Sequence, residues 1–226
     1  MKIRSLLLIV FACFLTLSSC KSKEEKAAEL IKQELAKTLY DFESYEPIET
    51  TVTEAYATAY NDSICYNMAL VIGYEFSKVN EAIEKAKEAC EYADIWGAPT
   101  AYSSSYSDKK YYKYRNEAKE QLDKVDNGMA IIKSLGRTLQ DSIARLDENK
   151  QIGWEVKHRF RCKTRGGQAS IGDYRYVIAN NFKKVLLRED MDDEDDKRAR
   201  SMIKSAIEGQ FTEDETVKDD MVVVEE

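Results

Sequence analysis

Residues 62–99 form the stretch DSICYNMALVIGYEFSKVNEAIEKAKEACEYADIWGAP. Its apolar side chains recur at alternating steps of four and three residues, which predicts a long helix packed along a heptad seam. The seam comprises Cys65, Ala69, Ile72, Phe76, Val79, Ile83, Ala86, Cys90 and Ala93. Asn61-Asp62-Ser63 offers an N-cap. Gly97 and Pro99 end the helix, because glycine and proline do not continue it.

A second seam follows and predicts another long helix over residues 113–149. Its members are Leu122, Val125, Met129, Ile132, Gly136, Leu139, Ile143 and Leu146. Two seams of similar length joined by one loop predict an antiparallel, coiled-coil-like hairpin over residues 62–149. Each arm would be about 50 Å long at 1.5 Å per residue.

The sequence on either side of the hairpin changes period. Residues 24–40 show helical spacing, and the residues after the hairpin alternate apolar and polar side chains. Strands are expected at 48–57, 154–163, 169–178 and 182–188, with a short helix after the acidic run 189–196. The predicted fold class is α+β: a small antiparallel sheet with an N-terminal helix and an inserted long helical hairpin. We expect one domain over residues 25–209 and an acidic, disordered tail over 210–226.

The first twenty residues have the pattern of an export signal. A basic start, Met1–Arg4, precedes an apolar stretch over 5–17 that is too short to cross a bilayer. Leu17-Ser18-Ser19-Cys20 resembles the lipobox of bacterial lipoproteins. That resemblance implies a signal peptide at 1–19, a lipid on Cys20 and a tether at 20–24. The alternatives are an ordinary signal peptide or a short anchor helix.

Three further segments resemble uncharacterised lipoproteins of Bacteroidota. They are Lys23-Glu24-Glu25, which is similar to a surface-export signal of that group, Phe42–Thr50, and Phe160–Gly167. Thr164 departs from the asparagine of the pattern, and the long helical insertion is not general. The resemblance implies an outer-membrane, lipid-anchored protein that is periplasmic or surface-exposed, and it implies no activity. Lys23-Glu24-Glu25 has a simpler interpretation as a solvated tether.

Composition argues against several classes of function. The formal net charge is −7, and loss of the signal removes two positive charges, Lys2 and Arg4, so nucleic acid is not an expected partner. Cys65, Cys90 and Cys162 remain after lipidation, with one histidine, His158. These residues do not make a zinc site, and we expect no metal and no cofactor. The three cysteines are expected as small buried hydrophobes, and His158 as a packing residue.

The segment between the two long helices is unusually aromatic. It contains Trp96, Tyr102, Tyr106, Tyr111, Tyr112 and Tyr114, with three serines at 103–105. Tyrosine and tryptophan give large contact areas at low entropic cost, and exposed aromatic clusters are uncommon on monomers. We expect these rings to bind a protein or a glycan at the end of the hairpin. The alternative is that they fold back and seal it.

A basic stripe on the predicted strand 154–163 is the other candidate surface. Lys157, Arg159, Arg161 and Lys163, with Arg165 after them, could bind anionic headgroups, or form a solvated face balanced by acidic residues. The sequence therefore predicts a non-catalytic, membrane-anchored envelope lipoprotein whose hairpin end binds a partner. The alternatives are a self-assembling structural subunit of the envelope and a hydrolase without a recognisable motif.

Overall fold

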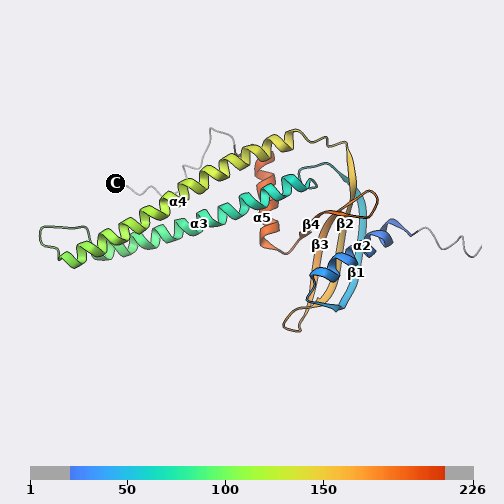
Figure 1. The fold of residues 1–226 in the computed structure, drawn as a ribbon, viewed down its shortest axis with the longest axis horizontal. Helices are drawn as coiled ribbons and strands as arrows, with labels where there is room; N and C mark the ends of the chain where they lie inside the picture. Colours follow the sequence, from blue (N-terminus) through green and yellow to red (C-terminus); the bar gives the residue numbers. More distant parts are fainter. Residues whose placement is uncertain (1–20, 212–226) are drawn as a thin grey trace, which may run out of the picture. The chain divides into compact units, whose positions relative to one another are not determined.

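A computed structural model of the chain describes residues 21–211. The expected signal peptide at 1–19, the expected lipid-bearing Cys20 and residues 212–226 of the expected tail lie outside the described residues. The described chain divides into two compact units. Residues 21–56 and 150–191 form a sheet unit, and residues 57–149 and 192–211 form a hairpin unit. The predicted α+β class is confirmed, and the elements follow one another as Figure 1 shows.

The sheet unit pairs one helix with four antiparallel strands in the order β1-β2-β3-β4. The elements are α2 (Lys23–Thr38), β1 (Asp41–Tyr56), β2 (Gln151–Lys163), β3 (Ala169–Ala179) and β4 (Val185–Asp190). Strand β1 is longer than the predicted 48–57, and it pairs with β2 along its length through several register shifts. Helix α2 begins inside the segment expected as a tether, because Ser22 and Glu25 form a reciprocal capping box.

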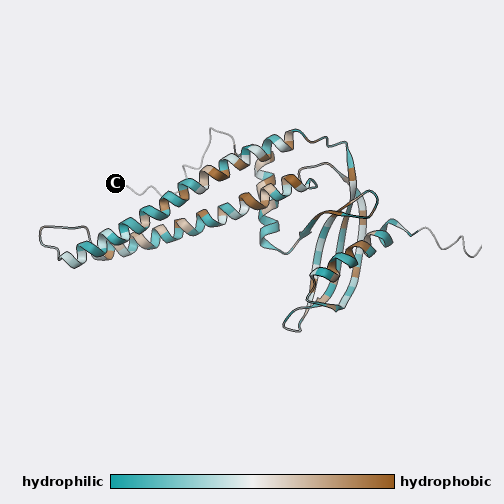
Figure 2. Cartoon of the chain, viewed as in Figure 1, coloured by the Kyte–Doolittle hydropathy of each residue, from teal (hydrophilic) through white to brown (hydrophobic). Residues whose placement is uncertain are grey.

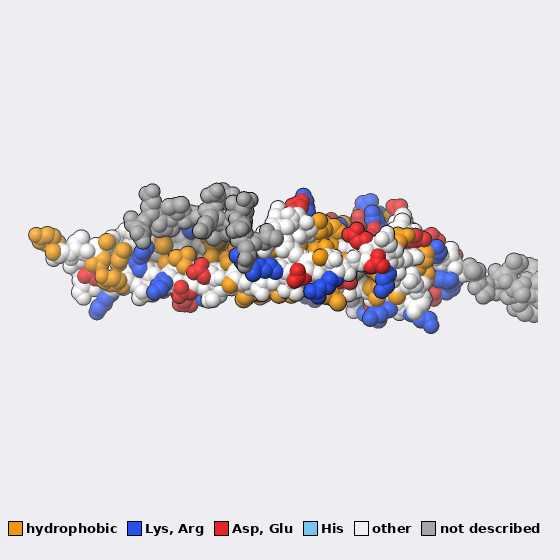
Figure 3. Space-filling view, turned by 90° about the horizontal axis from the view of Figure 1, so that it is seen from above, with side chains coloured by type: hydrophobic (Ala, Val, Ile, Leu, Met, Phe, Trp, Pro, Cys, Tyr) orange, Lys and Arg blue, Asp and Glu red, His pale blue; other side chains and the backbone are white. Residues whose placement is uncertain are grey.

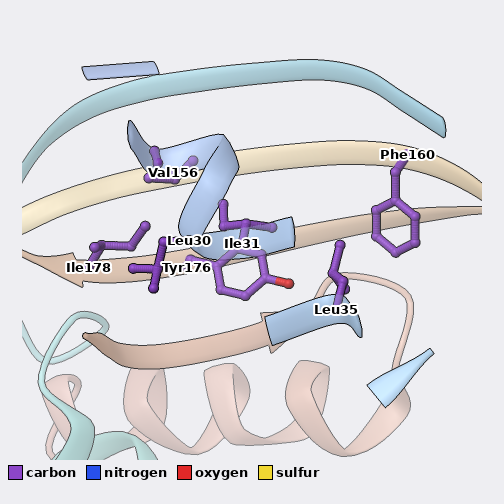
Figure 4. Close-up of a cluster of buried hydrophobic side chains, with 8 residues drawn as sticks. Leu30, Ile31, Leu35, Val156, Phe160, Tyr176 and Ile178 are labelled. Atoms are coloured by element: carbon purple, nitrogen blue, oxygen red, sulfur yellow. The ribbon is translucent and has the colours of Figure 1, made fainter. Parts of the chain in front are cut away.

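Helix α2 packs on one face of this sheet. Leu30, Ile31 and Leu35 of the helix meet apolar side chains of β2 and β3, as Figure 4 shows. The strand residues of this core are Val156, Phe160, Tyr176 and Ile178. Even-numbered residues of β2 face the core and odd-numbered ones face away, as the period of a strand requires.

The hairpin unit contains α3 (Ser63–Trp96), α4 (Ser105–Ala144) and α5 (Glu194–Ile207). Helices α3 and α4 pack along their length as the predicted hairpin, inserted between β1 and β2. Hydrophobic residues recur along both helices between hydrophilic stretches, as Figure 2 shows. Helix α5 packs mainly on α3, where the buried Tyr66 hydroxyl donates to Asp196 Oδ1 at 2.7 Å.

Most residues predicted for the two hairpin seams are buried, and most of the others are half-buried. The buried residues of α3 include Cys65, Ala69, Ile72, Val79, Ala86 and Ala93, all predicted, and also Ala82 and Ala89. In α4 the prediction for Leu122 was wrong, because this side chain is 50% exposed, whereas Gly128 is buried. Small residues line the seam in this region. A Cβ on Gly128 would lie only 2.5 Å from Val79 Cγ2, so the two helices approach more closely than a larger side chain would allow.

The described residues contain three cysteines. Cys65 is buried, Cys90 and Cys162 are half-buried, and none of the three forms a disulfide. Burial raises the pKa of the Cys65 thiol to about 12, which keeps it protonated and unreactive.

Among residues 21–211, no helix combines the length and the apolar character needed to cross a bilayer.

Candidate functional site

The six aromatic residues predicted as a site all lie at the free end of the hairpin. Trp96 ends α3 and Tyr102 lies in the connecting segment 97–104. The other four, Tyr106, Tyr111, Tyr112 and Tyr114, belong to the first three turns of α4. The prediction that α4 begins at residue 113 was wrong, since the helix begins at Ser105. We call this end of the hairpin, residues 92–114, the tip.

Short polar contacts fix the start of α4 and the connecting segment. Ser104 is the N-cap, and its hydroxyl accepts from the Ser107 amide at 3.1 Å. Ser103 Oγ donates to Asp108 Oδ1 at 2.5 Å, within the first turn of the helix. Gly97 has φ 65°, a left-handed conformation that glycine adopts without steric cost. The serines therefore build the turn, and the aromatic rings take no part in these polar contacts.

Two pairs of rings close the space between the helices. Tyr92 of α3 stacks on Tyr114 of α4 with centroids 5.2 Å apart, and Trp96 meets the edge of Tyr106 at 5.5 Å. Trp96 and Tyr114 are half-buried. Aromatic pairs of this geometry stabilise by about 1 kcal/mol beyond the area that they bury. This part of the cluster seals the end of the hairpin, as the alternative interpretation expects.

The outer part of the cluster is open to solvent. The side chain of Tyr102 is 99% exposed, Ile95 is 73% exposed and Tyr106 is 61% exposed. Tyr112 is also exposed, and its ring meets the edge of Tyr111 at 5.5 Å. Figure 3 shows hydrophobic side chains gathered at this end of the hairpin. Tyr106 thus meets Trp96 in an inner pair and is itself mostly exposed, and no described residue covers the exposed faces of Ile95, Tyr102, Tyr106 and Tyr112.

Lysines border these rings. Lys110 Nζ lies 5.7 Å from the Tyr106 ring centroid, and Lys113 Nζ lies 5.1 Å from that of Tyr114. Such cation–π contacts are worth about 0.5–1 kcal/mol at exposed sites. They hold the lysine side chains against the rings, and they place positive charge beside the apolar surface.

Sequence reasoning missed two residues of the tip, Tyr92 and Ile95. Both lie in the last two turns of α3, outside the seam that defined the helix. Their only signal in the sequence is that large apolar side chains occupy non-seam positions just before Gly97. An end-of-helix position outside the seam faces solvent, so this signal could have assigned them to the surface.

His158 lies in the core of the sheet unit, as expected. Its Nε2 is 2.8 Å from the Tyr45 hydroxyl and its Nδ1 is 2.9 Å from Thr50 Oγ1. The ring stacks near Phe160 and is fully buried. Desolvation lowers the pKa of His158 to about 4, so the imidazole is neutral at neutral pH and uses both nitrogens in structural contacts.

The basic stripe on β2 faces away from α2 and is exposed. The register places Arg159 between Glu49 of β1 and Asp173 of β3. Arg161 Nη1 lies 3.9 Å from Glu46 Oε2. Neighbouring strands thus supply carboxylates opposite the cations, and the arrangement favours a balanced, solvated face.

A groove of about 350 Å³ lies between α3 and α4, part-way along the hairpin. Val79, Ala82, Gly128 and Ile131 contribute its apolar lining. The lysines at its edge, Lys78, Lys85 and Lys124, pair with Glu75, Glu81 and Glu120 at 2.6–3.0 Å. These charges are engaged in ion pairs along the helices, so the groove offers a small apolar recess and no convergent set of acids and bases.

Comparisons with known proteins leave the site to be interpreted from its own geometry. No protein-family model matches the chain, and neither the curated proteins nor the solved structures contain a match.

Proposed function

We propose that the chain is a non-catalytic, lipid-anchored envelope protein that binds a partner protein through the tip of its helical hairpin. The observation that carries the proposal is that four large side chains of the tip, Ile95, Tyr102, Tyr106 and Tyr112, stay exposed although ring pairs join the two helices there. Large exposed apolar patches on soluble proteins commonly mark interaction sites. The localisation follows from the lipobox resemblance at Cys20 and is part of the proposal.

A protein partner fits this surface better than a glycan does. Ile95 is an exposed aliphatic side chain of the tip, and burial of aliphatic area favours an apolar recess on a partner. Tyrosines with nearby lysines, such as Tyr106 with Lys110, are typical of binding surfaces that combine apolar contact with polar edges. A glycan remains the alternative ligand, since aromatic faces also stack on sugar rings.

The test compares tip variants with a matched control. We expect the variant Tyr102→Ser/Tyr106→Ser/Tyr112→Ser to lose capture of a partner from envelope extract that the unaltered chain retains. Loss of one interface aromatic costs about 1–4 kcal/mol, so the triple variant should weaken binding by at least 100-fold. The control is Tyr74→Ser, an equally exposed tyrosine of α3 outside the tip. Equal capture by the triple variant would refute the proposal, and a ligand identified only on a glycan array would replace the protein partner.

Self-assembly is the second candidate function, and a specific observation favours it. Leu122 and Ile131 of α4 are about half-exposed, and both lie outside the tip. A second hairpin could cover such positions by helix–helix packing. Sedimentation at increasing concentration separates the candidates: self-assembly predicts an oligomer that Leu122→Ser/Ile131→Ser dissociates, whereas tip binding predicts a monomer.

A further inference from the structure

The start of α2 and the turn between β3 and β4 form a single surface of the sheet unit. Lys23 Nζ lies 3.8 Å from the centroid of the Trp154 ring. That ring stacks on Phe182 with centroids 5.8 Å apart and an interplanar angle of 15°. Trp154 Nε1 also donates to the carbonyl oxygen of Asn180 at 3.4 Å. Figure 1 shows the beginning of α2 and this turn at the same end of the sheet.

Phe182 holds an unusual backbone conformation in this turn. Its φ of 56° is the only positive φ of a non-glycine residue among the described residues. A side chain with a Cβ is unfavourable there, and a bulky one more so. Hydrogen bonds from the Phe182 amide to Ala179 O and from the Ala179 amide to Lys184 O, both 2.9 Å, close the turn around it. A strained residue that the surrounding structure maintains is a reason to look for a function.

The turn is also cationic. Lys183 and Lys184 follow Phe182, both are exposed, and neither pairs with a carboxylate in the described part of the chain. Lys23 adds a third positive charge. Of the carboxylates at this end, Glu25 accepts from the Ser22 amide and Glu54 accepts from the Tyr56 hydroxyl. Glu24, next to Lys23, has a lowered pKa through hydrogen bonds to its own backbone and to Ser22.

The position of this surface in the chain indicates what it meets. Lys23 is three positions after Cys20 in the chain, so their Cα atoms are at most about 11 Å apart. A lipid on Cys20 would therefore hold this end of the sheet unit at the bilayer surface. Tryptophan and other aromatic rings favour the headgroup level of a bilayer, and lysines favour anionic headgroups.

We propose that the surface formed by Lys23, Trp154, Phe182, Lys183 and Lys184 docks on the anionic lipid headgroups of the leaflet that holds the Cys20 acyl chains. This inference rests on the anchor of the proposed function and is independent of the tip. The chain as a whole is acidic, with a net charge of −7, so an anionic membrane repels most of it. A local cationic surface beside the anchor therefore fixes which end of the sheet unit faces the lipid.

The test uses Trp154 as a depth probe. The chain from Cys20 to Glu226 carries Trp96→Phe, which leaves Trp154 as the sole tryptophan, and Cys90→Ser and Cys162→Ser, which direct coupling to Cys20. Coupling to a maleimide lipid in vesicles of 70% phosphatidylcholine and 30% phosphatidylglycerol reproduces the anchor whether or not cells lipidate Cys20. Phosphatidylcholine brominated near its headgroup then quenches any tryptophan that reaches the interface. Circular dichroism verifies that each variant is folded.

We expect strong quenching of Trp154 that Lys183→Ser/Lys184→Ser removes, because each lysine near an anionic surface contributes about fivefold and the pair about 25-fold. The matched control is Lys157→Ser/Arg159→Ser, which removes the same charge from the exposed face of β2 and should leave quenching unchanged. Equal quenching in the turn variant, absence of quenching in the reference chain, or loss in the control instead would each overturn the proposal. Tip binding is measured on the uncoupled chain, so failure of one proposal is distinguishable from failure of the other.

Discussion

Arg175 of β3 donates from Nε to Glu189 Oε2 of β4 at 2.6 Å, and both side chains are buried. The two residues are direct cross-strand neighbours. Arg175 Nη1 also contacts Glu155 Oε2 of β2 at 3.1 Å, so one guanidinium joins three strands. This ion pair lies on the face of the sheet opposite α2, because Tyr176, the next residue of β3, packs in the helix-covered core.

Removal of one partner of this ion pair should lower the free energy of unfolding far more than removal of both partners. We expect Arg175→Met to lower the free energy of unfolding of the sheet unit by about 3–5 kcal/mol, because it removes the guanidinium that pairs with the buried Glu189 side chain. The double variant Arg175→Met/Glu189→Leu should recover most of that loss. Urea titrations followed by Trp154 fluorescence in a Trp96→Phe background measure both values. A double variant as unstable as the single one would contradict this explanation.

Two buried tyrosines should respond in opposite directions to loss of their hydroxyl groups. The Tyr176 hydroxyl is buried and has no hydrogen-bond partner among residues 21–211, so Tyr176→Phe should raise the free energy of unfolding of the sheet unit by about 1 kcal/mol. The Tyr66 hydroxyl donates to a carboxylate, so Tyr66→Phe should lower that of the hairpin unit by about 1–3 kcal/mol. Trp154 and Trp96 fluorescence report the two units separately. Destabilisation by Tyr176→Phe would show that its hydroxyl has a partner in solution.

His158 should make the sheet unit less stable in mild acid. Its pKa is about 4 in the folded chain against 6.5 in the unfolded one, so the unfolded chain takes up a proton first as pH falls. Stability is therefore full above pH 6.5 and declines towards pH 4, by about 2 kcal/mol between pH 7.5 and 5. His158→Gln should flatten the curve in this interval. Since His158 is the only histidine, its NMR titration gives the folded pKa directly, and a value near 6.5 would contradict the prediction.

The periodic parts of the fold were predictable because a single physical pattern dominates them. The heptad seam from Cys65 to Ala93 and the alternation from Trp154 to Cys162 each report burial of one face, and the structure confirms both. The start of α4 was not predictable in this way. Ser105–Tyr112 is almost continuously aromatic and polar, so it shows no seam, and the Ser104 cap that begins the helix resembles any other serine in a loop.

Individual contacts between segments far apart in the chain were also not predictable from the sequence. The core position of His158 followed from the alternation of β2, but its partners Tyr45 and Thr50 lie more than a hundred residues earlier in the chain. The same holds for the tip. Its aromatic content was evident, whereas the division into inner rings such as Trp96 and outer rings such as Tyr102 depends on how two helices meet.

A methyl group added at Gly136 would have two opposing effects on the free energy of unfolding, one from helix propensity and one from a steric clash. The sequence shows only a glycine in a helix, where alanine would stabilise by about 1 kcal/mol. In the structure, a Cβ on Gly136 would lie 2.3 Å from the ring of Phe211, which is buried against α4. Gly136→Ala should therefore displace Phe211 and lower the free energy of unfolding of the hairpin unit by about 1–3 kcal/mol.

The sign of this effect should reverse once the ring is absent. In a Phe211→Gly background neither the ring nor the Cβ of residue 211, which would lie 2.8 Å from the added atom, remains, so Gly136→Ala should stabilise the hairpin unit by about 1 kcal/mol through helix propensity alone. Urea titrations of the four chains, followed by Trp96 fluorescence, complete the double-mutant cycle. Stabilisation by Gly136→Ala in both backgrounds would show that Phe211 does not pack on Gly136 in solution. Effects of Gly136→Ala with opposite signs in the two backgrounds would establish that Phe211, after α5, is part of the folded hairpin unit.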